Sequence, residues 1–247
     1  MPDQVRVTVL VENTAARPGV QPEHGFSAWV EADGANVLFD TGASDLVCAN
    51  ADALGVDLAK ADAVVLSHGH YDHTGGLAAV AERAPGARIF LHPDAEVEPP
   101  ARDVVLSRRP EIAAPGVWTT GEVPRVTEFE TSREPPVPFP DDQALFFETA
   151  GGVVVIVGCA HAGVVNTLRH VAALTKRETL HAVFGGMHLR SAPEDRVRRT
   201  ADAFREFGLE RIGPCHCTGD RVIGSFEREF PDAFFRCGTG TVVSFEG

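Results

Sequence analysis

Four side chains that can bind metal ions lie close together in the segment 67–77, which reads SHGHYDHTGGL. They are His68, His70, Asp72 and His73, and imidazole nitrogen and carboxylate oxygen are the usual protein ligands of Zn²⁺ and related transition ions. Because two of the histidines flank one glycine and the other two donors are adjacent, one short loop can direct them at two neighbouring ions. So dense a set of donors predicts a metal centre rather than a polar loop of solvated histidines.

Two later histidines follow short apolar segments. His161 comes after the run 153–157, and His216 comes after the segment 211–214. In layered α/β proteins, active-site residues gather where strands end at one edge of a sheet. Either histidine alone would more often be structural, but the first cluster needs partners, so we expect both to be metal ligands.

The segments around these donors predict alternating strands and helices. Apolar runs predict strands, one-sided apolar patterns predict helices, and Asp33-Gly34 predicts the turn of a hairpin. Two halves of similar order predict two mixed sheets packed face to face with helices outside. We expect strands at 1–13, 25–32, 36–40, 62–67, 143–149, 153–157, 179–184, 211–214 and 241–245, and helices at 74–84, 163–176, 195–207 and 220–230.

The segment 93–142 differs from the rest, because it holds ten of the 17 prolines. Long regular helices are unfavourable in such a segment. We interpret it as an insertion over one face of a single domain, residues 1–247, rather than as a domain boundary, and expect it to lie beside the metal centre. Arg108 and Arg109 lie within it, and an arginine pair can bind a phosphate, although acidic neighbours equally suit a solvated surface cluster.

Composition limits the function classes. The 247 residues are 44% hydrophobic and 23% charged, and 22 basic against 35 acidic residues give a net charge of −13, which argues against broad nucleic-acid or anionic-membrane binding. No apolar run is long enough to span a membrane, and residues 1–13 lack the features of a signal peptide. Five scattered cysteines are not a secreted disulfide framework, so we expect a cytoplasmic protein with reduced thiols.

The pattern His-x-His-x-Asp-His at 68–73 resembles the signature of the metallo-β-lactamase superfamily. Asp40-Thr41-Gly42 matches an early motif of that family. The resemblance extends over nearly the whole chain except 93–142, and it favours the subgroup of 7,8-dihydropterin-6-ylmethyl-4-(β-D-ribofuranosyl)aminobenzene-5′-phosphate synthases and related metal-dependent hydrolases. The resemblance implies an α/β (α+β) fold, the αββα four-layer sandwich. The subgroup motifs are at 23–27, 67–77, 158–166, 185–189 and 214–219.

The resemblance also implies a cofactor of two divalent metal ions, most simply zinc, with manganese or iron as alternatives, sharing a bridging water or hydroxide. Asp40 would orient a ligand histidine through its ring N–H. The ligands of one ion would be His68, His70 and His161, and those of the other Asp72, His73 and His216.

One departure from the family concerns a bridging aspartate, which commonly follows the strand predicted at 179–184. Here Gly186 is followed by Met187, and His188 is the one candidate donor in that segment. We expect His188 to be catalytic with Asp72, as a ligand, proton donor or substrate contact, the alternative being a structural histidine.

Other side chains near these motifs have less specific signals. His24 and Tyr71 are candidates for substrate contact, although packing suits Tyr71 as well. Cys215 and Cys217 flank His216, so alternation along an extended chain would turn both away from its side, and we interpret them as bystanders. Cys159, two residues before His161, receives the same interpretation.

The predicted function is a metal-dependent hydrolase that uses a metal-bound hydroxide on a small, phosphorylated substrate. One alternative is a transferase that displaces diphosphate from a pterin, as in the synthases of the subgroup, because it needs the same ligands. A second is a non-catalytic metal-binding or sensing protein. The expected partner is a small molecule, with neither nucleic acid nor membrane, and the oligomeric state is left open.

Overall fold

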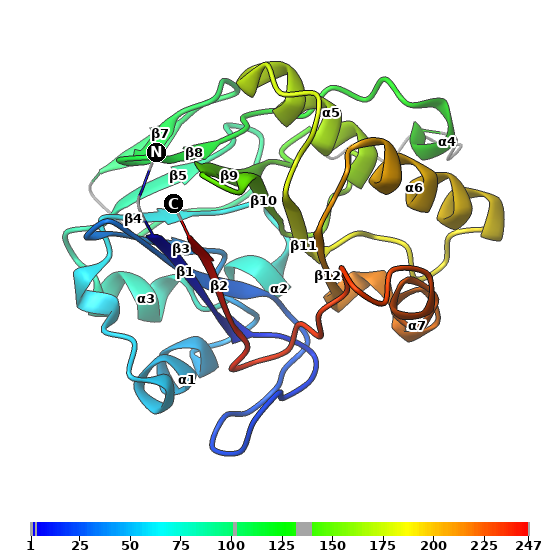
Figure 1. The fold of residues 1–247 in the computed structure, drawn as a ribbon. Coiled ribbons are helices and arrows are strands. Elements are labelled where there is room, and N and C mark those ends of the chain that lie inside the picture. The colour runs from blue at the N-terminus through cyan, green and yellow to red at the C-terminus, as the bar shows by residue number, and fades with distance from the viewer. Residues whose placement is uncertain (1, 3, 101–102, 132–139, 247) are drawn as a thin grey trace.

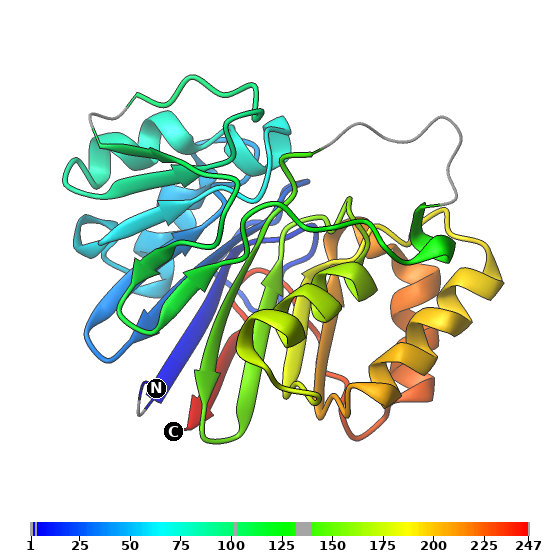
Figure 2. The same ribbon diagram turned by 90° about the horizontal axis from the view of Figure 1, so that it is seen from above.

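The structure, a computed structural model, describes all residues except 1, 3, 101–102, 132–139 and 247. Its strands form two sheets that pack face to face, with helices on both outer sides (Figure 1, Figure 2). Apolar side chains of both sheets, among them Val7, Phe39, Leu145 and Phe184, fill the space between them. The predicted αββα sandwich is therefore confirmed.

The first sheet contains seven strands in the described part of the chain, in the order β13-β1-β2-β3-β4-β5-β6. Neighbours from β3 to β6 are parallel, and the remaining pairs are antiparallel. The predicted hairpin is present, with Asp33 and Gly34 at positive φ in its turn. The strands are β1 (Gln4–Val11), β2 (Ser27–Ala32), β3 (Ala35–Phe39), β4 (Ala63–Val65), β5 (Arg88–Leu91), β6 (Val104–Leu106) and β13 (Val242–Glu246).

The second sheet has the order β12-β11-β10-β9-β8-β7 among the described residues. Strands β10, β11 and β12 are parallel, so their carboxyl ends meet at one edge. The strands are β7 (Ile112–Ala114), β8 (Val117–Thr119), β9 (Ala144–Thr149), β10 (Gly152–Val157), β11 (Ala182–Gly186) and β12 (Arg211–Cys215).

Helices cover both outer faces. Apolar residues of α1 and α3 pack on the first sheet, and those of α5, α6 and α7 pack on the second. The predicted helix 74–84 corresponds to α3, which begins at Leu77, while Thr74 ends α2. Between the two helices, Gly75 and Gly76 lie against the carbonyl oxygens of Ala43 and Thr41, where no side chain fits. The helices are α1 (Leu46–Leu54), α2 (Tyr71–Thr74), α3 (Leu77–Arg83), α4 (Glu128–Thr131), α5 (Val164–Thr175), α6 (Glu194–Glu206) and α7 (Asp220–Glu229), with short 3-10 turns at Leu58–Lys60 and His216–Thr218.

The proline-rich segment 93–142 is built into the sandwich rather than laid over one face. Its described part supplies β6 to the first sheet and β7 and β8 to the second. Short strands with three residues each satisfy their backbone groups between the prolines, which a helix would not allow. The sequence interpretation as an insertion over one face is wrong in this respect, and residues 132–139 lie outside the described chain.

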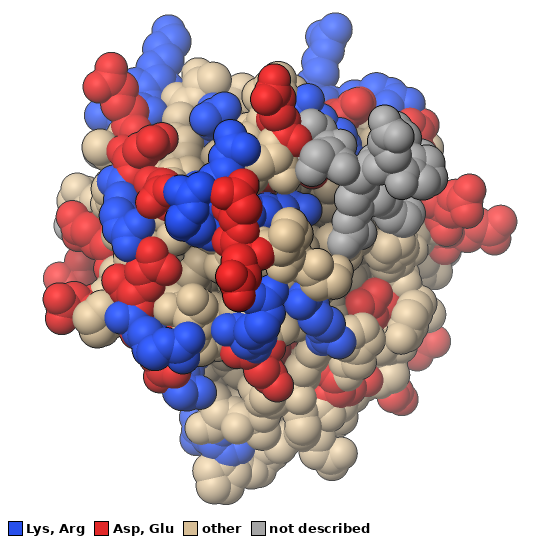
Figure 3. All heavy atoms as spheres, turned by 90° about the vertical axis from the view of Figure 1, so that its right-hand side faces the viewer, with Lys and Arg blue, Asp and Glu red and all other residues tan. Residues whose placement is uncertain are grey.

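The last strand crosses back to the first sheet. β13 pairs antiparallel with β1, so Gln4 lies opposite Glu246 and the two ends of the chain are side by side (Figure 1). On the face at the right-hand side of Figure 1, which includes α6 and α7, Arg side chains are interspersed with Asp and Glu (Figure 3). One ion pair of α6 joins Arg198 to Asp195 at 2.6 Å. None of the described helices is both long and apolar enough to cross a membrane.

Candidate metal centre

The donor-rich loop predicted from the sequence follows β4 and leads into α2. His68 and His73 are buried, and Asp72 and His73 lie in the first turn of α2. The loop is fixed by Gln143, whose side-chain amide donates to the carbonyl of Leu66 at 2.8 Å and whose backbone N–H donates to that of Ser67 at 2.9 Å. The loop therefore places its donors at the edge where β4 ends, close to the second sheet.

The first predicted ligand set comes together at this edge. The rings of His68, His70 and His161 lie 4.6 to 4.9 Å from one another, centroid to centroid. Ser67 Oγ contacts His68 Nδ1 at 2.8 Å. His68 Nε2 is buried and has no hydrogen-bond partner among the described residues. A buried, unpartnered imidazole nitrogen beside two further imidazoles fits a cation ligand.

The second predicted set is equally close. His216 Nε2 lies 3.2 Å from His73 Nε2 and 3.3 Å from Asp72 Oδ2, and the remaining pair is 3.8 Å apart. Ligand atoms about 2.0–2.2 Å from one tetrahedral ion are separated by roughly 3.3–3.6 Å. The three separations, from 3.2 to 3.8 Å, lie around this spacing.

Asp40 connects both sets from the end of β3. Its Oδ2 lies 2.7 Å from His73 Nδ1 and accepts a hydrogen bond from Ser67 Oγ at 2.7 Å, while Oδ1 accepts one from Ser67 N–H at 2.6 Å. Since Ser67 Oγ also contacts His68, one buried carboxylate orients an imidazole in each set. This is the placement that the sequence assigned to Asp40.

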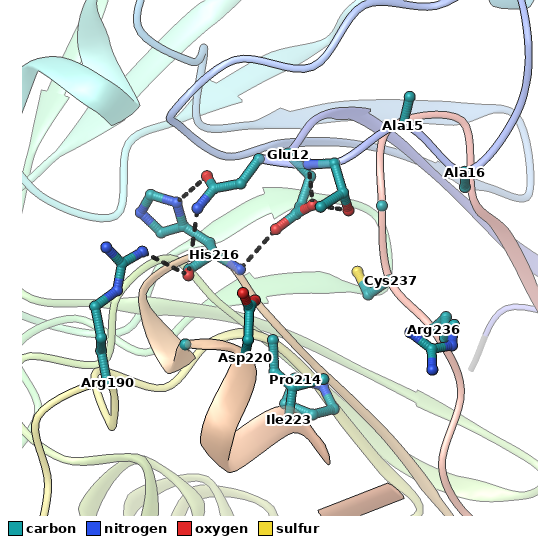
Figure 4. Close-up of a pocket in the computed structure, with 14 residues that line it drawn as sticks. Glu12, Ala15, Ala16, Arg190, Pro214, His216, Asp220, Ile223, Arg236 and Cys237 are labelled. Atoms are coloured by element: carbon teal, nitrogen blue, oxygen red, sulfur yellow. Dashed lines mark hydrogen bonds between the residues drawn. The ribbon is translucent and has the colours of Figure 1, made fainter.

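His216 is fixed by residues that sequence reasoning missed. Glu12 Oε1 accepts a hydrogen bond from the His216 N–H at 2.8 Å, and Asn13 Oδ1 lies 3.0 Å from its Nδ1. Arg190 donates to its carbonyl oxygen at 3.4 Å (Figure 4). Glu12 and Asn13 come directly after the alternating strand β1, so their position at a strand end was the available signal.

The surroundings favour the metal-binding protonation states of His68, His161 and Asp72. Burial lowers the pKa of His161 to about 2, with the nearby His188 adding to the effect, and burial together with His73 holds the pKa of His68 well below its ordinary value. Burial alone would raise the pKa of Asp72, but the hydrogen bond from His216 and the charge of His73 outweigh burial, so this pKa lies below its ordinary value. Neutral imidazoles and an ionised carboxylate are the forms that bind cations.

His188 follows β11 and lies beside the first set. Its ring centroid is 4.4 Å from that of His161, and its Nδ1 is buried with no hydrogen-bond partner among the described residues. His188, Asp40, Ala160 and His216 are four of the six non-glycine residues with positive φ that the structure describes. Such backbone strain concentrates at functional sites.

Cys159 and Cys217 do not face away from the donors, so the orientation expected for them from alternation is wrong. Cys159 Sγ lies 3.2 Å from His73 Nε2, and Cys217 Sγ accepts a hydrogen bond from His188 N–H at 3.3 Å. Alternation failed because the chain is not extended here, since Ala160 has positive φ and His216–Thr218 is a 3-10 turn. Cys215 does pack in the core between the sheets.

Two aspartates at the end of the proline-rich segment brace the donor loops and were also missed. Asp141 Oδ2 accepts from Gly69 N–H at 2.7 Å, and Asp142 Oδ2 accepts from Ala162 N–H at 2.7 Å. Burial raises the pKa of Asp142 to about 7. The segment thus holds the loop of His68 to His73 and the loop of His161 by hydrogen bonds to their backbones.

A pocket of about 270 Å³ opens on the donors, and we call it the site pocket. His24 lies in it, with Nε2 3.3 Å from Asp72 Oδ2. Tyr71 is 67% exposed and lies outside the lining. The described residues that line the site pocket are His24, His70, Asp72, Cys159, His161, His188, Arg190, Ser191, His216 and Cys217.

Neither Arg108 nor Arg109 lines the site pocket, in contrast to the sequence expectation. Arg108 instead pairs with Asp94 at 2.6 Å and with Glu122 at 3.1 Å, the solvated cluster that was the alternative. Among the described residues that line the site pocket, the one Lys or Arg is Arg190, which the sequence did not single out.

A larger pocket of about 660 Å³ adjoins the site pocket and shares Arg190 and His216 with it. Glu12, Asp220 and Arg236 also line it (Figure 4). The two pockets together offer room for a substrate larger than the group that reacts.

Comparison with known proteins gives consistent matches. Residues 20–216 match the family described as the Metallo-beta-lactamase superfamily. A 7,8-dihydropterin-6-methyl-4-(beta-D-ribofuranosyl)-aminobenzene-5'-phosphate synthase from Methanocaldococcus jannaschii shares 26% identity over 286 residues, covering 98% of this chain and 97% of the relative.

Solved structures are similar over the whole chain. The crystal structure of Tm1679, described as a metal-dependent hydrolase of the beta-lactamase superfamily, shares 31% identity with a TM-score of 0.82 and covers 98% of this chain and 100% of its own. YhfI from Bacillus subtilis, described as a metallo-beta-lactamase fold protein, has a TM-score of 0.68 at 16% identity, with 98% and 100% covered, and shows the fold alone.

Proposed function

Since this chain belongs to the metallo-beta-lactamase superfamily, we propose that it is a metal-dependent hydrolase of a small, anionic substrate, a phosphoester above all. Its nitrogen and oxygen donors suit two divalent ions, with zinc preferred over manganese or iron. In this proposal His68, His70 and His161 hold one ion, and Asp72, His73 and His216 hold the other.

The observation that carries the proposal is that members of both donor sets line one pocket, while His68 Nε2 beside them is buried without a hydrogen bond among the described residues. Burying such a nitrogen without a partner is unfavourable, and a cation relieves that cost. The relative that is 31% identical and described as a metal-dependent hydrolase supports the same chemistry.

Two divalent ions, when bound, would acidify a water and polarise the bond to be broken. The chain's own contribution is to position groups around that bond. Asp72 supplies the one carboxylate among the proposed ligands, and the proton at its partner His216 is directed by Asn13. His188 lines the site pocket, so its imidazole would donate a proton to the leaving group or bind it.

The charge of the site determines the substrate class. Five neutral imidazoles and one carboxylate leave two divalent ions with a net positive charge, and Arg190 adds a further cation at the pocket. Local fields of this kind attract phosphate groups although the chain carries −13 overall. The adjoining pocket, with Arg190 and Arg236, would take the remainder of the substrate.

The Methanocaldococcus relative supports a second function, a synthase-like transferase that displaces diphosphate from a pterin. A pterin ring calls for a flat aromatic partner. None of the described residues that line the site pocket is Phe, Tyr or Trp. We therefore place hydrolysis first, and a non-catalytic metal-binding role last.

Metal analysis followed by a substrate panel tests these functions. We expect bound divalent metal and hydrolysis of at least one member of a panel of phosphoesters and lactones, with Asp72→Asn inactive. Turnover of a pterin diphosphate with an arylamine, without phosphoester hydrolysis, would establish the transferase. Bound metal without any turnover would favour the non-catalytic role.

A further inference from the structure

Cys159 Sγ lies between the two proposed ligand sets. It is within 4.8 Å of the donor atoms of His68 and His161 and, in a second group, within 4.8 Å of those of His73 and His216. Among the described residues, it is the one donor that is grouped with members of both sets. The distance from Cys159 Sγ to His73 Nε2 is 3.2 Å.

The position of this sulfur is set by the sheet. Cys159 follows β10 directly and is buried, yet it lines the site pocket. Gly186 N–H donates to the carbonyl of Gly158 at 3.1 Å, so β11 holds the chain just before Cys159. Cys217 donates from its thiol to the Cys159 carbonyl at 3.6 Å.

The proposed ligands carry little negative charge, and the described residues after β11 supply no carboxylate to the centre. Asp72 is the one carboxylate among the proposed ligands of two divalent ions. At Gly186, a Cβ would lie 2.7 Å from Cys217 Sγ and 3.1 Å from His216 Cδ2, so a larger side chain is excluded there. Met187, the next residue, is fully buried in the core under α5 to α7.

We propose that Cys159, as a thiolate, is a ligand shared by both ions of the metal centre, an inference that rests on the proposed function. Zinc binds thiolate at about 2.3 Å and imidazole at about 2.0–2.1 Å, so the two atoms lie about 3.6 Å apart around one ion. The sulfur–nitrogen distance of 3.2 Å is close to that spacing. Binding forms metal–sulfur bonds and releases the thiol proton to solvent.

Cobalt(II) substitution tests the inference by a spectroscopic signal that is independent of turnover. The protein, kept reduced, is loaded with cobalt, and bound cobalt is counted alongside the near-ultraviolet sulfur-to-cobalt charge-transfer band. We expect the band in the unaltered protein and its loss in Cys159→Ser. The buried Cys48→Ser, in α1, is the matched control and should keep the band, as should Cys217→Ser.

Two further variants test whether the ligand is shared. His161→Ala and His216→Ala each remove a ligand of one ion, and the band should persist in both because the sulfur still contacts the other ion. Loss of the band in either variant would overturn the sharing. A band that survives in Cys159→Ser, or that depends on Cys217, would overturn the assignment.

The design separates this inference from the proposed function. Bound cobalt without any charge-transfer band would contradict the thiolate ligand but not the metal centre. The absence of bound cobalt would contradict the thiolate ligand and the proposed metal-dependent function together. If Cys159→Ser does not fold, X-ray absorption of the zinc-loaded, unaltered protein against Cys217→Ser answers the same question. A sulfur scatterer at about 2.3 Å in both samples supports Cys159, and its absence from either one contradicts the proposal.

Discussion

Asp40 reaches both ligand sets, because it contacts His73 directly and His68 through Ser67. We expect Asp40→Asn to bind metal about 10–100-fold more weakly, as is typical when the partner of a ligand imidazole is altered. Chelator competition measures this affinity. Asp45→Asn, an exposed carboxylate without a side-chain cap bond, is the control. Unchanged affinity in Asp40→Asn would contradict the orienting role.

The roles left open for His188 have different consequences. Since His188 lines the site pocket and its buried Nδ1 has no partner among the described residues, we expect it to act on the substrate. His188→Ala should then lower kcat by about 10²–10⁴-fold, the usual contribution of a positioned acid or base, with metal content unchanged. Metal content and kcat are measured on the same sample, and a parallel loss of both would make His188 a ligand instead.

Among the elements, α4 supports the metal centre from a distance by capping α5. The Glu130 carboxylate accepts hydrogen bonds from Val165 N–H at 3.0 Å and Asn166 N–H at 2.7 Å, in the first turn of α5. Burial raises the pKa of Glu130 above 4.5, and these two bonds only partly offset the effect. The loop that carries His161 ends where this helix begins.

The raised pKa of Glu130 gives a pH-dependent stability of known sign. Between 4.5 and the raised value the folded state binds more protons than the unfolded state, so stability falls as pH rises through this window. We expect the free energy of unfolding to fall less with pH in Glu130→Gln than in the unaltered protein, as measured by urea titrations from pH 4.5 upward. The exposed Glu128→Gln is the control, and an equal slope in Glu130→Gln would refute the assignment.

Elements differed in how well the sequence predicted them. Strands such as β10 and helices such as α6 have strong periodicity and were found within a few residues. The strands of the proline-rich segment were missed, because three-residue strands carry no period and their pairing partners are remote. The local motif was enough to predict His68, His70, Asp72 and His73 as donors. Glu12 and Asp141 are remote from it in the sequence and reach the centre only in the folded chain, so no local pattern indicated them.

At the scale of the whole molecule, β13 joins the end of the chain to its beginning and lies over the core. Phe245 is buried between the sheets, with its ring 5.8 Å from that of Phe147 and 6.3 Å from that of Phe184. We expect Phe245→Ala to lower the free energy of unfolding by about 3–5 kcal/mol in urea denaturation. Val242→Ala, on the same strand but 40% exposed, should cost far less, and equal costs would contradict this packing.

Each proposed ligand set draws on both sheets. His68, Asp72 and His73 follow β4 of the first sheet, while His161 and His216 follow β10 and β12 of the second. A ligand that binds only the folded state stabilises it, by about 4 kcal/mol at a thousand times its dissociation constant. We expect exhaustive chelation to lower the midpoint of thermal unfolding and added zinc to restore it. An unchanged midpoint would mean that the ions do not span the sheets.

This arrangement would give the ions a second role, as a cross-link between the two sheets. The five cysteines are free thiols, so no disulfide ties one sheet to the other. Metal supply would then govern the lifetime of the protein as well as its chemistry. In protein synthesised where metal is scarce, the sheets would separate more readily at the edge that carries the donor loops. These loops would then be the first sites of proteolysis.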